Sequence, residues 1–356
     1  MHYYEIPAYQ EELKTLLEQV ENREALKRKT FLLSGATGML GSLLTDLLLY
    51  ANRHENWGCR VVALVRNPEK AEKRFSGLGE ADGLTLIKAD LGQALPPDTA
   101  ERVGKADYII HLASNTHPKQ YATDPVNTVL SNIIGTDSLL KLSAQLKARF
   151  LLLSSVEIYG ENRGDTEKFR EDYCGYIDCG TLRAGYPEGK RAAEALCHAY
   201  ARQFGVDFVT VRLARAYGPT LQRSDTKAMS QFIWNALAGE PIVLKSEGTQ
   251  QYSYIYAGDA VRGILWLLTE GQCGEAYNLS GKDSDVRLKE LAGNIAALAG
   301  TEVRFELPDA VEAAGYSKAT KAMLDDAKVQ AAGFRPAYDI QAGMARTMRI
   351  LARLYT

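Results

Sequence analysis

The stretch "TFLLSGATGMLGSLL", residues 30–44, leads from a run of apolar residues through a glycine-rich turn into a helical pattern. Gly35, Gly38 and Gly41 have the spacing of a dinucleotide-binding turn, which needs a tight bend, a close approach of backbone to pyrophosphate and close helix–strand packing. Amides at the start of the following helix would then face the phosphates. This stretch alone is equally compatible with an ordinary glycine-rich turn, so the flanking sequence has to distinguish between a dinucleotide-binding turn and an ordinary one.

The flanking sequence alternates short apolar strands with helices as far as about residue 217. Strand patterns lie at 59–67, 84–91, 106–114, 149–155 and 207–214. Helical patterns lie at 39–53, 124–146 and 186–204. Such an alternation predicts an α/β fold with a Rossmann-type doubly wound parallel sheet. In that context the dinucleotide-binding turn is favoured, and we expect a dinucleotide-binding Rossmann domain over residues 29–217.

The two ends of the chain differ from this central part. Leu13, Leu16, Leu17 and Val20 have helical spacing, so residues 9–28 predict an amphipathic helix. We expect residues 1–28 to form an N-terminal helical extension that packs on the outside of the domain. Short strands and helices follow residue 217, so residues 218–356 predict a smaller mixed α/β lobe for substrate, from which the chain could return to the main sheet.

Composition excludes several classes of protein. The 356 residues are 46% hydrophobic and 24% charged, with a net charge of −2, which is ordinary for a globular protein. A nucleic-acid partner is not expected because there is no basic excess, and a membrane is not expected because no apolar run is long enough. The polar N-terminus is unlike a signal peptide, so we expect a cytoplasmic protein. The five cysteines lack zinc-ligand spacing, and no metal site is predicted.

The end of the second predicted strand bears on the choice of cofactor. An acidic side chain at this place binds the ribose 2′-hydroxyl of NAD, whereas an arginine suits the 2′-phosphate of NADP. Here the strand ends in Arg66, with Lys70 nearby. The sequence therefore favours NADP over NAD, with NAD and a surface arginine as the alternative.

Further motifs follow the glycine turn in a fixed order and cover nearly all of the chain after residue 30. They are "GATGMLG" (35–41), Asp90–Leu91, "HLAS" (111–114), "NIIGT" (132–136), "LLSSVEIYG" (152–160), "YPEGK" (186–190), "RLARAYGP" (212–219), "SYIYAGDAVRGI" (253–264) and "GEAYNLSG" (274–281). With these motifs the chain resembles the extended short-chain dehydrogenase/reductase family, in its NAD-dependent epimerase/dehydratase branch that acts on nucleotide sugars.

The resemblance implies site residues. Ser155, Tyr186 and Lys190 match the catalytic Ser, Tyr and Lys, and Asp90 matches the residue that binds the adenine ring. The cofactor contacts that it implies are Gly35, Thr37, Gly38, Met39, Leu40, Gly41, Arg66, Asp90, Leu91, Leu112, Ala113, Ser114, Tyr186 and Lys190.

The chemistry explains why these residue types are needed. To oxidise a sugar hydroxyl, a base must take its proton as hydride leaves for the nicotinamide. A free tyrosine has a pKa of about 10, which a nearby ammonium lowers. Lys190 lies about one helical turn past Tyr186, so both side chains can face the cofactor. Ser155, at the end of a predicted strand, can bind the same substrate oxygen.

The next residues bear on which product forms. Glu157 matches a glutamate of the branch's dehydratases and decarboxylases, but Val156 stands where dehydratases place an aspartic acid. Tyr252, in "GTQQYSY", stands where decarboxylases carry an arginine. By elimination we expect a nucleotide-sugar epimerase that oxidises C4 transiently, with Glu157 as an additional catalytic candidate. The alternatives are a dehydratase or decarboxylase with an altered site, an NADPH-dependent ketosugar or carbonyl reductase, and a non-catalytic dinucleotide-binding protein.

Other departures concern the substrate and the assembly. Arg215 replaces an asparagine that binds diphosphate in many relatives, and Lys321 falls roughly where an arginine often binds phosphate. With Tyr252 they are the candidate substrate contacts, with a solvated surface cation as the alternative for either charge. The long connection 161–185 is a candidate lid. Because relatives dimerise through two helices per subunit, the resemblance implies a homodimer through helices near 125–146 and 186–204.

Overall fold

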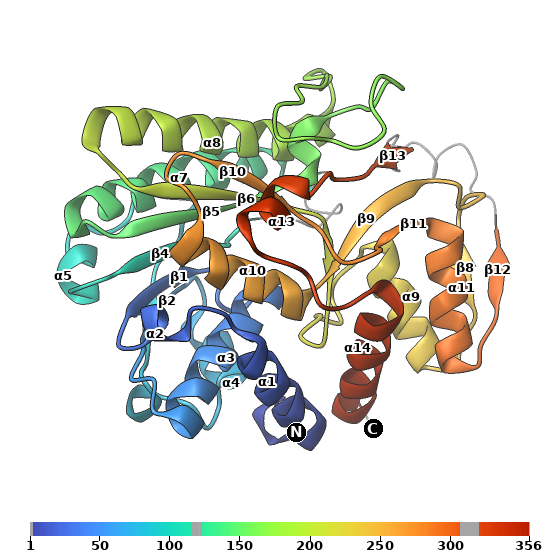
Figure 1. Cartoon of the computed structure of the whole chain (residues 1–356), viewed down its shortest axis with the longest axis horizontal. Coiled ribbons are helices and arrows are strands. Elements are labelled where there is room, and N and C mark those ends of the chain that lie inside the picture. Colours follow the sequence, from blue (N-terminus) through green and yellow to red (C-terminus); the bar gives the residue numbers. More distant parts are fainter. Residues whose placement is uncertain (1–2, 115–120, 122, 307–319, 356) are drawn as a thin grey trace.

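The computed structural model describes residues 3–114, 121, 123–306 and 320–355 (Figure 1). At its centre lies a parallel sheet of seven strands in the order β10-β6-β5-β4-β1-β2-β3. The strands are β1 (Thr30–Ser34), β2 (Arg60–Val65), β3 (Leu84–Lys88), β4 (Tyr108–His111), β5 (Arg149–Ser155), β6 (Phe208–Leu213) and β10 (Ala276–Leu279). The predicted doubly wound α/β fold is confirmed, and the seventh strand comes from beyond residue 217.

Helices cover both faces of this sheet. On one face are α3 (Met39–Glu55) and α10 (Ala257–Glu270), and on the other are α7 (Pro125–Leu146) and α8 (Gly185–Phe204). Side chains alternate along a strand, so Phe31 and Leu33 join one buried cluster while Leu32 joins the other. Burial on both faces explains the continuous apolar runs in the strands. Of the shorter helices, α4 (Pro68–Arg74) and η2 (Glu80–Asp82) pack against β3, and α5 (Thr99–Val103) packs against α7.

The N-terminal segment packs against this core and against the C-terminal helix. It consists of η1 (Tyr3–Glu5), α1 (Pro7–Gln19) and α2 (Arg23–Leu26), and α1 contacts α3, α10 and α14. The prediction of one helix over 9–28 is wrong in its second half. The helix ends because Val20 is extended (φ −65°, ψ 125°) and Asn22 is left-handed (φ 52°).

The smaller lobe begins at the carboxyl end of β6. Its sheet places β9 (Gln251–Tyr256) between β11 (Asp285–Arg287) and β13 (Lys321–Ala322), with β7 (Arg215–Tyr217) also pairing with β9. A two-stranded sheet of β8 (Ile242–Leu244) and β12 (Val303–Phe305) lies beyond it (Figure 1). The lobe's helices are α9 (Ala228–Leu237), α11 (Leu288–Ala299), α13 (Ala327–Ala332) and α14 (Ile340–Tyr355).

Two features are absent from the described part of the chain. Across it, no helix combines the length and apolar character needed to cross a membrane. Nor do three or more His, Cys, Asp or Glu side chains gather there in a way that could hold a metal ion. The five cysteines carry free thiols.

Candidate active site

Ser155, Tyr186 and Lys190 lie together where β5 ends and α8 begins. Ser155 is the last residue of β5, and its hydroxyl is hydrogen-bonded to Tyr186 in the first turn of α8. One turn further on, the Lys190 ammonium donates a hydrogen bond of 2.7 Å to the carbonyl oxygen of Leu153. Tyr186 and Lys190 are only 6% and 2% exposed. The fold therefore brings all three predicted catalytic side chains into one site, in which Ser155 is half-buried.

Burial acts on the two ionisable groups in opposite directions. It raises the pKa of Tyr186 well above its usual value, the charge of Glu157 adds to this, and the hydrogen bond with Ser155 opposes it. Burial lowers the pKa of Lys190 to about 8, against the opposing effect of the Glu194 carboxylate. Tyr186 is thus held neutral in the free protein, and a further positive charge or a proton acceptor has to arrive before it can act as a base.

The glycine turn has the backbone that a dinucleotide requires. Gly35 has φ 75°, and a Cβ placed on it would lie 2.7 Å from the amide nitrogen of Ala113. A Cβ on Gly41 would overlap the carbonyl oxygen of Gly35. Helix α3 begins with Gly38 as its N-cap and has no side-chain cap there, so its first amides face outward. The turn lies beside residues 112–114, which follow the neighbouring strand β4, and it fits a pyrophosphate.

The other predicted cofactor contacts surround this turn. Arg66 and Asp90 follow β2 and β3, and both are exposed. The Asp90 carboxylate accepts a hydrogen bond of 3.0 Å from the Gly92 amide, which fixes its direction. The Ser114 hydroxyl donates to the side chain of Asn132 on α7 (2.9 Å). Of the remaining predicted positions, Met39 and Leu40 begin helix α3, and the others lie in the turns that follow β1, β3 and β4: Thr37, Leu91, Leu112 and Ala113.

Two side chains that the sequence analysis missed lie next to Tyr186. Tyr121 stacks on it, with the ring centroids 5.4 Å apart and the planes at 22°. The Arg183 guanidinium lies 5.9 Å from the centre of the Tyr121 ring and forms an ion pair of 3.3 Å with Glu157. Neither residue stands in a recognisable motif, so only the folded chain reveals them. Glu157, a catalytic candidate, is therefore a paired carboxylate within the site.

The predicted substrate contacts come from the smaller lobe. The Arg215 guanidinium lies 3.8 Å from the centre of the Tyr252 ring, and its Nε is buried without a hydrogen-bond partner. The charges of Arg215, Arg183 and Glu157 all act on the pKa of Tyr252. Groups from both lobes thus face one site. Lys321 stands on β13 opposite Gln251, on the strand that carries Tyr252.

His111 is a third residue near the site that the sequence analysis did not single out. Its Nδ1 lies 2.7 Å from the Ser34 hydroxyl, which also accepts a hydrogen bond from the Ala113 amide. The ring is fully buried, and burial together with the charge of Lys190 lowers its pKa to about 3. The neutral His111 therefore links the end of β4 to Ser34 at the end of β1, and Ser34 in turn holds the segment after β4.

The connection 161–185, predicted as a candidate lid, is anchored at several points. Phe169 is fully buried and stacks on Tyr159, with the ring centroids 5.0 Å apart. Arg191 on α8 donates hydrogen bonds to the carbonyl oxygens of Ile158 and Gly175. The connection ends in the short helix η4 (Leu182–Ala184), which carries Arg183. Glu157, its ion-pair partner, lies on the short helix η3 (Val156–Tyr159) that precedes the connection.

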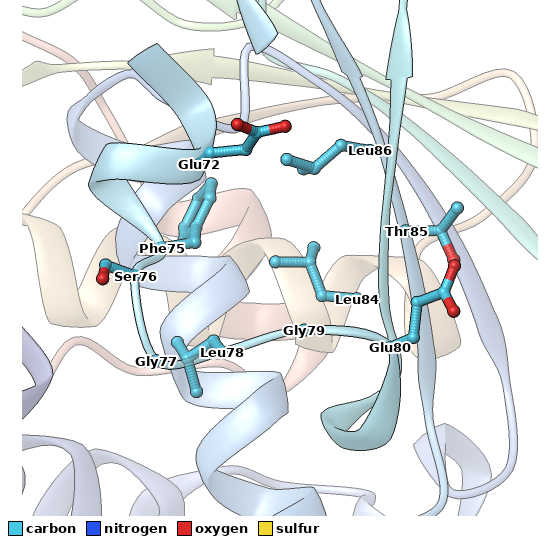
Figure 2. A pocket seen from close by; sticks show the side chains of 10 residues that line it. All are labelled: Glu72, Phe75, Ser76, Gly77, Leu78, Gly79, Glu80, Leu84, Thr85 and Leu86. Carbon is cyan, nitrogen blue, oxygen red and sulfur yellow. The ribbon is translucent and has the colours of Figure 1, made fainter. Parts of the chain in front are cut away.

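A separate hollow lies beside β3, the edge strand of the main sheet. It has a volume of about 420 Å³ and lies between α4, the loop to η2, and the edge strand β3 (Figure 2). Its lining includes Phe75, Leu84 and Leu86 together with the carboxylates of Glu72 and Glu80. None of the predicted catalytic, cofactor or substrate residues lines it, so it is distinct from the candidate active site.

The Rossmann-type sheet, the glycine turn and the Ser-Tyr-Lys site together define an extended short-chain dehydrogenase/reductase. Within that class the chain belongs to the NAD dependent epimerase/dehydratase family, whose sequence model matches residues 31–280. The family resemblance stated from the motifs is confirmed. The chain is accordingly an enzyme of the nucleotide-sugar epimerase, dehydratase and decarboxylase group.

Individual relatives differ in their reactions. UDP-glucuronic acid decarboxylase 1 of Danio rerio is 30% identical over 329 residues, which are 92% of this chain and 73% of the relative. UDP-glucuronic acid 4-epimerase of Bacillus cereus, solved with UDP-glucuronic acid and NAD, has a TM-score of 0.77 at 22% identity, over 92% of this chain and all of that one. dTDP-glucose 4,6-dehydratase of Bacillus anthracis, solved with NAD, has a TM-score of 0.74 at 17% identity, over 92% and 97%. The two solved structures establish a shared fold, and the choice of reaction rests on the site.

Proposed function

We propose that this protein is a nucleotide-sugar 4-epimerase that uses a bound nicotinamide dinucleotide. The observation that carries the proposal is the set formed by Ser155 and the buried Tyr186 and Lys190, together with an apolar residue beside it. Val156 is buried and has no proton to donate, so the site lacks the acid that water elimination needs at that position. A 4-epimerase needs only the three residues and room for a 4-ketosugar to turn over.

The residues divide the proton chemistry among them. Tyr186 takes the proton of the C4 hydroxyl and later returns it, while the Ser155 hydroxyl holds the same oxygen. The Lys190 ammonium favours the phenolate form of Tyr186 by its positive charge. A bound nicotinamide supplies the acceptor and donor of the C4 hydride. Tyr121, stacked on Tyr186, fixes the plane of its ring and keeps water from one side.

Decarboxylation of a nucleotide-linked uronic acid is the second candidate. It is favoured by the decarboxylases among the relatives that are about 30% identical in sequence. It is also favoured by the guanidinium of Arg215 over the Tyr252 ring, because this cation lies next to the position where decarboxylases carry arginine. A carboxylate on the sugar would pair with Arg215, whose Nε has no partner, and Glu157 would supply the acid or base.

The products formed without added cofactor distinguish these functions. We would incubate the purified protein with UDP-, dTDP-, GDP- and CDP-sugars, including UDP-glucuronic acid, and identify the products by NMR. The proposal expects a 4-epimer with no net change in nicotinamide absorbance. Tyr186→Phe should slow turnover by about a thousandfold, whereas Tyr200→Phe, on the same helix but hydrogen-bonded to Asp137, should not.

Other outcomes would replace the proposal. Release of carbon dioxide with a pentose product would establish the second candidate. No conversion without cofactor, but net consumption of NADPH when it is added together with a ketosugar, would establish a ketosugar or carbonyl reductase. Binding of nucleotide sugars without conversion of any would make the protein a non-catalytic binder.

We also propose that Arg66 gives the protein a preference for NADP. The solved relatives above hold NAD, but here an exposed arginine follows β2, where a 2′-phosphate would lie. Arg66→Asp should therefore weaken NADPH binding at least tenfold and leave NADH binding equal or tighter, as measured by fluorescence titration. Lys73→Asp on the neighbouring helix α4 is the control for a general change of charge. Equal NADPH affinity in wild type and Arg66→Asp would contradict the preference.

A further inference from the structure

Two side chains of the smaller lobe hold the glycine turn from outside. The Thr220 hydroxyl donates a hydrogen bond of 2.7 Å to the carbonyl oxygen of Met39. The side-chain amide of Gln222 donates one of 2.7 Å to the carbonyl oxygen of Thr37. Both donors follow strand β7, and Thr220 is 3% exposed. The part of the turn that would hold pyrophosphate is thus tied to the other lobe.

These bonds set the direction of an amide that faces the cofactor. In a trans peptide the carbonyl and the N–H point in opposite directions. A donor that fixes the Met39 carbonyl therefore also fixes the Leu40 N–H in the first turn of α3. First-turn amides have no partner within their helix and are free to bind an anion. A hydrogen bond on the carbonyl also polarises the peptide and strengthens its N–H as a donor.

The segment that carries Thr220 and Gln222 is packed firmly against the rest of the smaller lobe. Strand β7 pairs with β9, with Tyr217 opposite Tyr256. Gly218 leaves no room for a side chain against Ala257, and the Leu221 amide closes a turn onto the Gly218 carbonyl oxygen. The Leu221 side chain is 2% exposed. Because the segment is packed in this way, it cannot leave the glycine turn without moving the lobe.

We propose that Thr220 and Gln222 form a latch that retains the nicotinamide dinucleotide between turnovers. The proposal rests on the proposed function, in which the cofactor is reduced and re-oxidised in place. In such a cycle, loss of the reduced cofactor would stop the enzyme, so slow release is an advantage. Release requires the turn at residues 35–41 to let go of the pyrophosphate, and the two hydrogen bonds to the lobe oppose that movement.

The test measures cofactor release directly. We would load the protein with NADH or NADPH, mix it with excess oxidised cofactor, and follow the loss of protein-enhanced fluorescence by stopped flow. Thr220→Val with Gln222→Met removes both donors at nearly constant size, and release should become about tenfold faster or more, as expected for two ordinary hydrogen bonds. Each single substitution should give part of the increase.

Two matched variants separate the latch from a general loosening of the turn. Thr220→Ser keeps the donor, so release should match wild type. Ser42→Ala removes a weaker bond to the same Met39 carbonyl oxygen (3.3 Å) that comes from within α3, so release should change little. Wild-type release from a folded double variant, or an equal acceleration in Ser42→Ala, would overturn the proposal. If the double variant does not fold, the single substitutions decide in the same way. Because cofactor release is measured without any sugar, the test of the latch does not depend on whether the epimerase assay succeeds.

Discussion

The Lys190 side chain is under opposing demands. In the proposed mechanism its ammonium favours the Tyr186 phenolate, yet the side chain is 2% exposed, and burial lowers its pKa from 10.5 to about 8. It donates a hydrogen bond to the Leu153 carbonyl oxygen, a neutral partner. A charge held in this way is stabilised less than it is in water. On the proposed function, the free protein is therefore less stable because it keeps a buried cation one helical turn from Tyr186.

Substitution of this lysine tests that cost. Below pH 8 the lysine is charged in both the folded and the unfolded protein, so the full free-energy cost of burying its charge applies. This cost disappears as the pH rises from about 8 to 10.5. Lys190→Met should therefore raise the free energy of unfolding of the cofactor-free protein at pH 7 by roughly 2–3 kcal/mol, while turnover is lost. The gain should shrink as the pH rises above 8.

Urea unfolding at several pH values checks this prediction. Lys141→Met is the control, because the Lys141 side chain is 67% exposed and pairs with Asp137 at the surface. It should change stability by less than about 1 kcal/mol at each pH. A Lys190→Met protein less stable than wild type at pH 7 would show that the lysine is not under strain.

At the scale of elements, helices α7 and α8 pack on each other across one face of the main sheet (Figure 1). On α7, Val126 is 66% exposed and Leu130 is 39% exposed, one helical turn apart. Phe204, at the end of α8, is 56% exposed. Large exposed apolar side chains thus lie at the start of α7 and at the end of α8, and such side chains are typical of an interface. They support the homodimer that the family resemblance implies.

Charged substitutions on α7 test the dimer. Val126→Glu with Leu130→Glu should give a monomer at micromolar concentration by light scattering, because two carboxylates would be buried against the partner. Leu298→Glu, at a site 47% exposed on α11, should leave the assembly unchanged. A wild-type protein that is itself monomeric would contradict the prediction at once.

At the scale of the whole molecule, the N-terminal helix joins parts of the chain that lie far apart in sequence. Glu12 on α1 is fully buried and accepts hydrogen bonds from the Tyr256 hydroxyl at the end of β9 (2.8 Å) and from Arg346 on α14 (2.5 Å). One carboxylate thus connects the N-terminal extension, the smaller lobe's sheet and the C-terminal helix. The extension is therefore part of the core.

Removal of this carboxylate should loosen that connection. Glu12→Ala should lower the free energy of unfolding by about 2–3 kcal/mol, because Arg346 and Tyr256 lose a charged partner. Glu11→Ala is the matched control, since the Glu11 side chain is 64% exposed and pairs with Arg349 at the surface. Thermal unfolding compares them, and equal melting temperatures would refute a special role for Glu12.

Much of the fold was predictable because its signals are local. Burial on both faces makes the strands continuous apolar runs, and the glycine turn needs backbone that only glycine supplies at Gly35. The break in the N-terminal helix at Val20 and Asn22 was missed because the apolar positions alone do not reveal an extended or left-handed residue. The spacing of Tyr186 and Lys190 was readable for the same local reason, as one helical turn separates them.

By itself, then, the sequence determined the doubly wound sheet, the dinucleotide turn and the Ser155, Tyr186 and Lys190 set. The tertiary structure alone decided what surrounds them. Arg183 reaches Glu157 from a long connection, and Thr220 and Gln222 reach the glycine turn from the other lobe. These partners are distant in sequence and follow no periodicity, so only packing of the two lobes specifies them. The residues of the turn and of the Tyr186–Lys190 pair are close in sequence and can be recognised by their spacing. The side chains that surround them come into contact with them only when the chain folds.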